Sequence, residues 1–436
     1  MRVLVVGGGA REHALAWKLS RSPRLERLWC APGNAGTAAL ATNLEIAPTD
    51  LEGLYRFAKR ERIDLTVVGP EAPLVAGIVD RFEQGGLSIV GPTRRAARLE
   101  GSKAYAKELM RKHTIPTADA RIFRRESDLR RYLEVAELPF VIKADGLAAG
   151  KGVYVCHTPQ DAEHALEQLY VRRRHGRAAD TVLVEEWLDG EEISVHALTD
   201  GETIVVLEDA RDYKRLLDGD RGPNTGGMGA VSPSARLDGG RLAQIEEQIL
   251  VPIVHALKRE GAPYRGVLYA GLMWTPSGPK VLEWNVRFGD PEAQVLLPRL
   301  EGDLLEVFAA LAHRRLSEAS VRWDARPAVG VVLASVGYPD NPVTGVPIRG
   351  VAEAEALAGV CVFHGGTARA RDGALVTAGG RVLTVTALGE TREAARARAY
   401  DAARRIHFEG MRFRTDIAAD GGGLNAPVGR GTTRRA

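Results

Sequence analysis

Short apolar runs alternate with helical patterns over residues 1 to about 100, and this alternation narrows the folds open to the chain more than any other feature. The apolar runs have the length of buried strands and stand at Val3–Val6, Leu28–Cys30, Leu65–Val68 and Leu87–Val90. Helical periodicity lies between them around 14–19, 54–58 and 75–82. Strands that alternate with helices at this spacing predict βαβ units and a parallel sheet, so we expect an α/β domain here.

Turn-forming residues follow each expected strand, at Gly7-Gly8-Gly9, Ala31-Pro32-Gly33-Asn34, Gly69-Pro70-Glu71 and Gly91-Pro92. Because ligands bind beyond the carboxyl ends of parallel strands, all four segments can line one crevice. The first segment opens a helix, a setting that holds phosphate, and Arg11 adds a bidentate donor. A dinucleotide site is disfavoured, because Glu12 takes the third glycine position and no acidic residue ends the second strand. A tight turn without a ligand stays the alternative.

The rest of the chain has a different texture, with a change near residue 101 and another near 326. In the middle part, Val182–Val184, Glu192–Leu198 and Thr203–Leu207 are expected to form a meander with a hairpin turn at Asp200-Gly201. From 327 to 388, short strands with Gly-Gly turns predict a small β-rich domain, closed by a helix over 391–406. Residues 421–436 are rich in Gly and Arg and lack periodicity, so we expect a disordered tail.

A lysine inside an apolar strand and the glycine-rich segment after it indicate a phosphate site. Lys143 follows Val141 and Ile142, where it is costly unless it meets an anion. The next segment, 146–152, contains Gly146, Gly150 and Gly152 and suits a flap whose amides cover a triphosphate. No hydroxyl residue follows Lys151, which excludes a P-loop. Lys103 is a weaker candidate, because most lysines are simply exposed.

Two further segments concentrate polar residues or glycine next to expected strands. The acidic run from Glu185 to Glu192 either binds ribose hydroxyls and orders a linker for adenine, or is a solvated turn. The segment Gly222–Gly229 has no periodicity, and we expect it to lie outside helices and strands. Segments so rich in glycine are usually mobile or pressed against a ligand. Just before it, residues 209–215 are dense in both charge signs.

The strand that ends in Glu283-Trp284-Asn285 carries the best metal candidate. Glu283 and Asn285 are two residues apart and therefore share one face of the strand. A carboxylate and an amide oxygen are hard ligands that suit Mg²⁺, which takes its other ligands from water and substrate phosphates. Arg287 continues this face and can neutralise a transferring phosphoryl group. The alternative is an edge strand whose polar residues face solvent, and acidic residues at 290 and 292 make it less favoured.

Composition excludes several classes of protein. The 59 Lys and Arg residues against 56 Asp and Glu give a net charge of +3, and the one dense basic run, 172–177, has no interleaved aromatic residue, so no nucleic-acid surface is expected. No apolar run is long enough to span a bilayer, and the N-terminal one is too short for a signal peptide. Cys30, Cys156 and Cys361 are odd in number and far apart, which indicates reduced thiols. We expect a cytoplasmic protein with neither nucleic-acid nor membrane partners.

Together these segments resemble the ATP-grasp superfamily and, within it, the phosphoribosylamine–glycine ligase family, from residue 1 to about 420. The motifs that carry the resemblance are Gly9–Ala14, Ala31–Thr37, Val68–Leu74, Lys143–Val153, Gly222–Ala230 and Arg287–Glu292. The resemblance implies an α/β and α+β multidomain fold with three parts. These are a Rossmann-like parallel-sheet domain over 1–100, an ATP-grasp domain over 101–325 with a mobile subdomain at about 122–190, and a β-rich domain over 326–420.

The reaction of that family joins glycine to 5-phosphoribosylamine at the expense of ATP, through glycyl phosphate, and gives glycinamide ribonucleotide for purine biosynthesis. The resemblance implies small-molecule partners, and we expect a monomer. By the same resemblance the site residues divide by ligand: Lys103, Lys143 and 146–152 hold the ATP phosphates; Glu185, Glu186 and Leu188 line adenine; Glu191 or Glu192 meets the ribose; Glu283 and Asn285 bind Mg²⁺ or Mn²⁺; Arg287, Asp290, Asp212 and Lys214 surround glycine and the acyl phosphate; Gly9, Arg11 and Glu71 face phosphoribosylamine.

Some positions depart from the family pattern. Arg211 and Tyr213 are the two that lie where substrate contacts are expected, and their roles stay open. Three alternatives to the glycine ligase also remain: another ATP-grasp enzyme such as a carboxylase, a nucleotide-binding module without turnover, and a Rossmann dehydrogenase. The module predicts loss of Lys143, Glu283 or Asn285, all of which are present, and Glu12 weakens the dehydrogenase.

Overall fold

The computed structural model describes residues 1–148, 151–234, 236–419 and 433–435, and its first hundred residues form the expected parallel sheet. The strand order is β3-β2-β1-β4-β5, with β1 at Arg2–Gly7, β2 at Arg27–Pro32, β3 at Thr42–Asn43, β4 at Leu65–Val68 and β5 at Ile89–Val90. The helices are α1 (Ala10–Leu19), α2 (Leu51–Arg60), α3 (Glu71–Ala76), α4 (Ile78–Gln84) and α5 (Arg94–Gly101). The single helix predicted over 75–82 is therefore wrong: Gly77, with φ of +99°, ends α3 and begins α4, because this left-handed conformation interrupts a helix.

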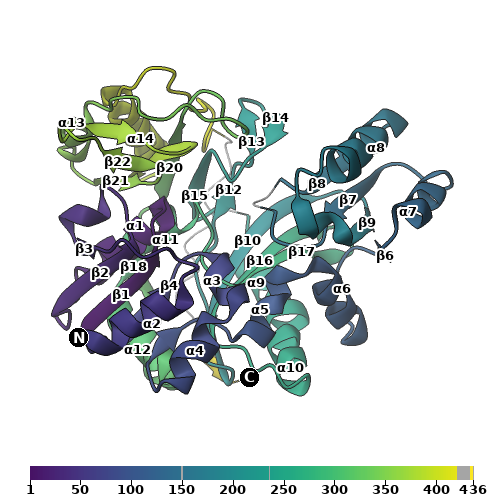
Figure 1. Ribbon diagram of the computed structural model, residues 1–436, viewed down its shortest axis with the longest axis horizontal. Coiled ribbons are helices and arrows are strands. Elements are labelled where there is room, and N and C mark those ends of the chain that lie inside the picture. Colours follow the sequence, from purple (N-terminus) through teal and green to yellow (C-terminus); the bar gives the residue numbers. More distant parts are fainter. Residues whose placement is uncertain (149–150, 235, 420–432, 436) are drawn as a thin grey trace.

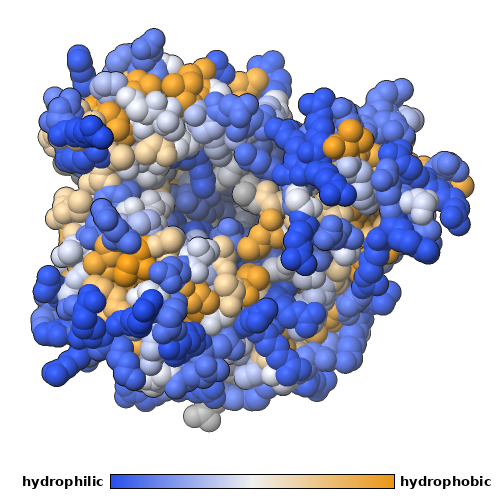
Figure 2. All heavy atoms as spheres, in the orientation of Figure 1, coloured by the Kyte–Doolittle hydropathy of each residue, from blue (hydrophilic) through white to orange (hydrophobic). Residues whose placement is uncertain are grey.

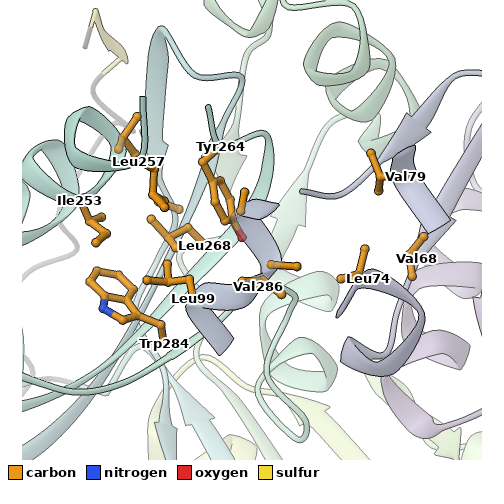
Figure 3. Close-up of a cluster of buried hydrophobic side chains, with 14 of the residues drawn as sticks. Val68, Leu74, Val79, Leu99, Ile253, Leu257, Tyr264, Leu268, Trp284 and Val286 are labelled. Carbon is orange, nitrogen blue, oxygen red and sulfur yellow. The ribbon is translucent and has the colours of Figure 1, made fainter. Parts of the chain in front are cut away.

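A second sheet forms the centre of the molecule in Figure 1. Its order is β17-β16-β10-β11-β25, with β10 at Glu191–Thr199, β11 at Thr203–Val206, β16 at Gly266–Thr275, β17 at Gly278–Asn285 and β25 at Thr433–Arg435. One apolar core joins this sheet to the first domain. Figure 3 shows Leu74 and Val79 of the first domain in the same cluster as Trp284 and Val286 of the second. Close packing in this shared core fixes the position of the first sheet relative to the central sheet.

A third sheet stands apart at the right of Figure 1 and carries the predicted phosphate lysine. Its order is β6-β9-β7-β8, with β6 at Ala120–Phe123, β9 at Val182–Glu186, β7 at Phe140–Ala144 and β8 at Val153–Cys156. Helices α7 (Glu126–Leu133) and α8 (Pro159–Leu166) belong to the same part. The predicted meander is therefore wrong in its first strand, because β9 pairs with β6 and β7 here, whereas β10 and β11 form the predicted hairpin in the central sheet.

The fourth sheet, at the top left of Figure 1, is made mainly by the C-terminal part of the chain. Its order is β12-β15-β20-β24-β21, with β12 at Arg211–Asp212, β15 at Gly229–Ser232, β20 at Ala328–Ala334, β24 at Arg381–Leu388 and β21 at Val360–His364. Helix α14 (Arg392–Arg405) begins after the N-cap Thr391, as predicted, and α13 (Val351–Glu355) lies before β21. Two strands of this sheet thus come from the chain before residue 326.

The predictions of a disordered tail and of an irregular glycine segment need correction. Residues 433–435 form strand β25, which pairs with β11. The other residues of 421–436 lie outside the described part of the chain. Gly222 to Asn224 belong to strand β14 (Arg221–Asn224), which pairs with β13 (Arg215–Leu217). Gly222 has a positive φ, which glycine adopts readily, close to the turn that joins the two strands. Only residues 225–228 form the connecting loop.

The remaining elements are helices and the strands of two further two-stranded sheets, β18-β19 and β22-β23. They are α6 (Lys103–Lys112), α9 (Gly239–Ile245), α10 (Val251–Arg259), α11 (Ala293–Arg299), α12 (Leu304–Ala312), β18 (Leu300–Glu301), β19 (Arg322–Trp323), β22 (Thr367–Arg369) and β23 (Leu375–Thr377), with short 3₁₀ or π segments at Thr37–Ala39, Glu167–Val171, Gly176–Asp180, Glu246–Leu250 and Leu316–Glu318. Among the described residues, no helix has both the length and the apolar character needed to cross a membrane.

Candidate active site

One face of the central sheet presents a row of polar side chains in register. His196 of β10 lies opposite Tyr269 of β16, which lies opposite Asn285 of β17. One step along, Gly271 lies opposite Glu283, and a β-carbon at Gly271 would stand 3.0 Å from the Glu283 side chain. The alternation of side chains along β17 therefore places Glu283 and Asn285 on one face, as predicted. Because Gly271 has no side chain, the Glu283 side chain can occupy the space above it.

The two predicted metal ligands are both oxygen donors, and cations surround them. Burial opposes ionisation of Glu283, but Lys214, with Nζ 3.7 Å away, and other lysines hold the pKa of this carboxyl below its usual range. Asn285 Oδ1 accepts a hydrogen bond of 2.8 Å from Arg287 Nη2. No cluster of three or more His, Cys, Asp or Glu side chains able to hold a metal occurs among the described residues. A carboxylate and an amide oxygen are ligands of the kind that Mg²⁺ takes, with water and phosphate oxygens as its others.

Arg287 connects this face to the first domain. Its guanidinium lies 3.3 Å from Glu71 of α3 and 3.0 Å from Glu100 of α5. Burial opposes the charge of Arg287, but the two carboxylates raise its pKa above the usual range. Burial raises the pKa of Glu100 to about 7, and the neighbouring Glu71 carboxylate adds to this rise while Arg287 opposes it. The structure therefore brings the predicted residues Glu71 and Arg287 together. Glu100 belongs to the same charged cluster, and the sequence analysis did not identify it.

A buried cluster of two lysines and one glutamate lies between the third sheet and the central sheet. Lys143 Nζ is 2.9 Å from Glu185 Oε2 and donates to Leu282 O at 3.1 Å. Lys107 Nζ reaches the same Glu185 oxygen at 3.1 Å, and burial lowers the pKa of Lys107 to about 8. Lys107 was missed, although its position four residues after Lys103 on α6 puts both lysines on one helix face.

Other predicted ATP residues lie close to this cluster. Lys103 Nζ donates to Ala144 O at 2.9 Å and to Gly146 O at 3.1 Å, and burial lowers the pKa of Lys103. Gly152 O accepts from Ala144 N at 2.8 Å, so the chain folds back on β7, whereas Gly150 lies outside the described residues. Lys103 thus joins Lys143 at the end of β7.

The predicted adenine and ribose residues separate into two surroundings. Leu188 packs with Ala118, Met273 and partly buried Leu282 in a small apolar cluster, a suitable surface for a flat base. The four predicted glutamates are engaged by cations: Glu185 by the two buried lysines, Glu186 by Lys280 at 2.9 Å, Glu191 by Arg241 at 3.2 Å and Glu192 by Lys214 at 3.5 Å.

The predicted acyl-transfer residues meet where the fourth sheet reaches the central one. Burial and the neighbouring Glu292 raise the pKa of Asp212 well above its usual range, and burial also raises that of Glu292. Asp290 behaves differently: burial opposes its ionisation, but Arg381 and Arg11 lower its pKa. Arg381 Nη1 lies 3.3 Å from Asp290 Oδ1 and donates to Asp290 O at 2.7 Å. The sequence analysis gave Glu292 no role of its own and missed Arg381.

A cavity of about 310 Å³ opens beside Asp290. Its lining comes from the first, second and fourth sheets and their connections: Gly8, Gly9, Ala10, Asp290, Gly365, Gly366, Gly379, Gly380, Arg381, Leu383 and Thr384. Figure 2 shows the molecule hollowed between its lobes on this side. Arg11, which donates to Phe288 O at 3.2 Å and pairs with Glu12 at 2.6 Å, lies in the adjoining wall. The predicted Gly9 therefore faces a space large enough for a small phosphorylated sugar.

Arg211 and Tyr213, the departures from the family pattern at which substrate contacts are expected, are not among the described residues that line this cavity. The Tyr213 side chain is buried in the core of the fourth sheet, where its hydroxyl accepts from Ala418 N at 3.0 Å. The Arg211 guanidinium lies over the Tyr213 ring at 4.5 Å from its centroid. Their arrangement is one of packing within the sheet.

Comparison with known families covers most of the chain. Residues 1–100 match the phosphoribosylglycinamide synthetase N domain, residues 101–293 its ATP-grasp (A) domain, and residues 328–420 its C domain. A phosphoribosylamine–glycine ligase of Rhodopirellula baltica is 51% identical over 423 residues, which are 95% of this chain and 97% of that protein. The enzyme of the same name from Caldanaerobacter subterraneus subsp. tengcongensis is 48% identical over 419 residues, with 96% and 100% covered.

Solved structures agree with the sequence relatives. The crystal structure of phosphoribosylamine–glycine ligase from Thermotoga maritima has a TM-score of 0.80 and 36% identity, and the match covers 96% of this chain and 100% of that one. The N5-carboxyaminoimidazole ribonucleotide synthetase of the same organism has a TM-score of 0.64 at 19% identity, with 93% and 99% covered, and shows a shared fold. The chain belongs to the phosphoribosylamine–glycine ligase family of ATP-grasp enzymes.

Proposed function

We propose that the chain forms an amide bond between glycine and 5-phosphoribosylamine at the site built around Glu283, Asn285 and Arg287, with glycyl phosphate as the intermediate. The observation that carries this proposal is the position of Arg287. Its guanidinium contacts Asn285 on the side of the lysine cluster and Glu71 on the side of the first-domain strand ends. A triphosphate on one side and a phosphorylated amine on the other would meet at this residue.

In the first step, a glycine carboxylate oxygen attacks the γ-phosphorus of ATP, an O–P bond forms, and the bond to ADP breaks. Lys143 and Lys103 are placed to hold the phosphate oxygens, since their ammonium groups lie at the end of β7. Glu283 and Asn285 would hold Mg²⁺, which would neutralise charge on the β- and γ-phosphates. Arg287 neutralises the transferring group from the other side. Positioning and charge neutralisation suffice for this chemistry, because no enzyme nucleophile is required.

In the second step, the amine of phosphoribosylamine attacks the acyl carbon, an N–C bond forms, and phosphate leaves with the C–O bond electrons. Asp290 and Gly9 share a wall of the cavity in which the amine would lie. Asp212, Glu292 and Lys214 gather next to this wall, so a buried carboxylate is available to accept the proton that the nitrogen loses. Lys214 would compensate the charge of the departing phosphate.

The remaining assignments follow the geometry around the lysine cluster. The apolar cluster around Leu188 would receive adenine, with the backbone and side chain of Glu186 at its edge, and Glu191 or Glu192 would bind the ribose hydroxyls. We also propose the domain limits 1–100, 101–325 and 326–420, and a mobile subdomain over about 122–190. Support for the mobile part comes from its separate core, formed by residues such as Phe140, Ile142 and Val184.

We further propose a cytoplasmic monomer. All three cysteines are free, which suits a reducing compartment. Light scattering coupled to gel filtration would test the monomer, since a mass near 94 kDa in place of 47.1 kDa would exclude it.

An assay of ADP formation with each substrate omitted in turn tests the proposed reaction. Release of ADP is expected to need both glycine and phosphoribosylamine, and the product is expected to be glycinamide ribonucleotide. Full turnover without glycine would refute the proposal. Dependence on bicarbonate would favour a carboxylase of the same superfamily, whose fold the chain shares.

A further inference from the structure

Two side chains from the C-terminal part of the chain hold the loop of residues 225–228. The Tyr338 hydroxyl accepts a hydrogen bond from Gly226 N–H at 2.8 Å. Arg381 donates to the carbonyl oxygen of the same glycine. Both backbone polar groups of Gly226 are therefore bound by residues that follow residue 326, so its position depends on the fourth sheet and its connections.

The same loop lies against the segment that carries Asp212 and Lys214. Thr225 donates to Lys214 O through both its N–H and its Oγ1, each at 2.8 Å. Gly227 has a φ of +110°, and a β-carbon there would stand 2.5 Å from Asp212 Oδ1. The loop thus fits closely against the Asp212 carboxylate and hydrogen-bonds the Lys214 backbone.

Asp212 is also attached to the C-terminal part through its own backbone. It lies in β12 opposite Ala230 of β15, and Ala230 lies opposite Gly330 of β20. The sheet and the 225–228 loop therefore restrain Asp212 from two sides. A displacement of the loop is expected to move the carboxylate, because interiors this closely packed transmit small shifts.

We propose that Tyr338 is a positioning residue for the ligase reaction: its hydroxyl fixes the 225–228 loop through Gly226 and thereby sets the positions of Asp212 and Lys214. This inference rests on the roles proposed above for Asp212 and Lys214. Among the described residues, no hydrogen bond or ion pair joins the Tyr338 side chain itself to a side chain proposed to bind ATP.

Tyr338 allows a cleaner test than Arg381. Arg381 also binds Asp290 and lines the cavity, so its replacement would disturb several contacts at once. Tyr338 is not among the described residues that line the cavity, and its ring lies close to Gly380, where a β-carbon would meet it at 2.3 Å. Tyr338→Phe removes one hydroxyl and leaves the ring that packs on Gly380.

Steady-state kinetics of Tyr338→Phe are expected to show kcat/KM for glycine reduced on the order of tenfold, because a small misplacement of reacting groups costs rate. KM for ATP is expected to change by less than about twofold, because, among the described residues, the contacts of Lys103 and Lys143 lie at β7 and not on the 225–228 loop. Tyr400→Phe is the matched control. Its hydroxyl donates to Arg414 O at 2.7 Å and accepts from Ile417 N at 3.1 Å in the core of the fourth sheet, so the variant loses two buried hydrogen bonds, neither of them to residues 225–228. The proposal is overturned if both variants change kcat/KM for glycine equally. It is also overturned if KM for ATP in Tyr338→Phe changes by as large a factor as kcat/KM for glycine.

A double-mutant cycle tests whether Tyr338 acts through the loop. Thr225→Val removes Oγ1, which donates to Lys214 O and accepts from Gly227 N at 3.0 Å, and keeps the shape of the side chain. If both residues act along one chain of contacts, the double variant loses less kcat/KM for glycine than the product of the two single losses. Independent, multiplicative losses would contradict the proposed route.

Hydrogen exchange separates failure of this inference from failure of the proposed reaction, because it needs no turnover. Exchange of the Gly226 amide, followed in peptides that span 222–229, is expected to accelerate in Tyr338→Phe and to stay at the parent rate in Tyr400→Phe. Unchanged exchange in Tyr338→Phe would refute the positioning contact whatever reaction the chain catalyses. If exchange and the kinetic split behave as expected for Tyr338 but the parent needs no glycine, the fault lies in the proposed function.

Discussion

The guanidinium of Arg287 lies 3.0 Å from the carboxylate of Glu100, so the residue proposed to neutralise the transferring phosphoryl group is held by the last turn of a helix in the first part of the chain. Glu100 also accepts from Val286 N at 2.7 Å. The pair therefore links the end of β17 to α5. Residues far apart in the sequence thus determine the orientation of a central cation of the site.

Glu100 is expected to make stability depend on pH. Burial raises its pKa to about 7 in the folded chain, whereas the unfolded value is near the ordinary 4.5. The folded chain then binds more protons between these values, so the stabilising contribution is complete below about pH 4.5 and is lost as pH rises towards 7. Glu100→Gln does not titrate, and its Tm relative to the parent is expected to increase between pH 5 and pH 8. A Tm difference that stays constant across this range would show that Glu100 does not titrate there.

Glu283→Ala is expected to abolish turnover and to leave the fold intact, because Glu283 supplies the one carboxylate of the proposed metal pair. Glu202→Ala is a suitable control, since Glu202, in the turn between β10 and β11, forms an exposed pair with Lys258 of α10. Activity and circular dichroism of both variants should be measured over a range of Mg²⁺ concentrations. Near-normal activity of Glu283→Ala at low Mg²⁺ would refute the metal role.

Mg²⁺ removal is expected to weaken nucleotide binding in the parent. A nucleotide that binds only the folded chain stabilises it by about 2.7 kcal/mol at a hundredfold excess over Kd, and this appears as a rise in Tm. With a non-hydrolysable ATP analogue, EDTA is expected to reduce the rise in the parent but to change it little in Glu283→Ala. Equal responses to EDTA in the two proteins would place the ion elsewhere.

The buried lysine cluster predicts a contrast between two substitutions. Glu185→Gln leaves two buried ammonium groups, Lys143 and Lys107, without their shared carboxylate, and is expected to lower the free energy of unfolding by about 3–5 kcal/mol. Lys143→Met keeps the Lys107–Glu185 pair, so it should destabilise less while raising KM for ATP by tenfold or more, on the order of the loss of a charged hydrogen bond. Urea unfolding and ATP kinetics measure the two quantities. A larger stability loss in Lys143→Met would contradict this arrangement.

Arg381→Met is expected to raise KM for phosphoribosylamine more than KM for ATP. The guanidinium lines the cavity and holds the Asp290 backbone and carboxylate, whereas the lysines proposed for ATP lie at β7. Arg326→Met, which removes an arginine whose exposed pair with Asp324 lies outside this cavity, serves as the control. Equal increases in the two KM values of Arg381→Met would argue against a specific role in the cavity.

Much of the fold could be predicted because local periodicity reports it directly. The alternation of apolar runs and helical patterns correctly indicated the parallel sheet, and the two-residue repeat of β17 placed Glu283 and Asn285 on one face. The cost of burying a charge likewise singled out Lys143 within β7, where the structure supplies Glu185 as its counter-ion.

The same reasoning could not assign strands to sheets. β9 has the same local pattern as β10, yet it pairs with β6 and β7, and β12 and β15 join the sheet of the C-terminal part. Partner choice depends on the burial of distant faces, which a single strand's pattern does not contain. Only the tertiary structure decided that Asp212 lies in a sheet shared with β20.

The sequence by itself determined which residue types are available: hard oxygen donors at 283 and 285, a strand lysine at 143, and glycine turns at the strand ends. Only the tertiary structure decided what each of them meets. Lys107 beside Glu185, Glu100 beside Arg287, and Tyr338 and Arg381 on Gly226 are contacts between segments distant in the chain. Local periodicity reports the face on which a side chain lies, whereas its neighbours across space depend on how whole elements pack, because the burial of many apolar groups together sets that packing.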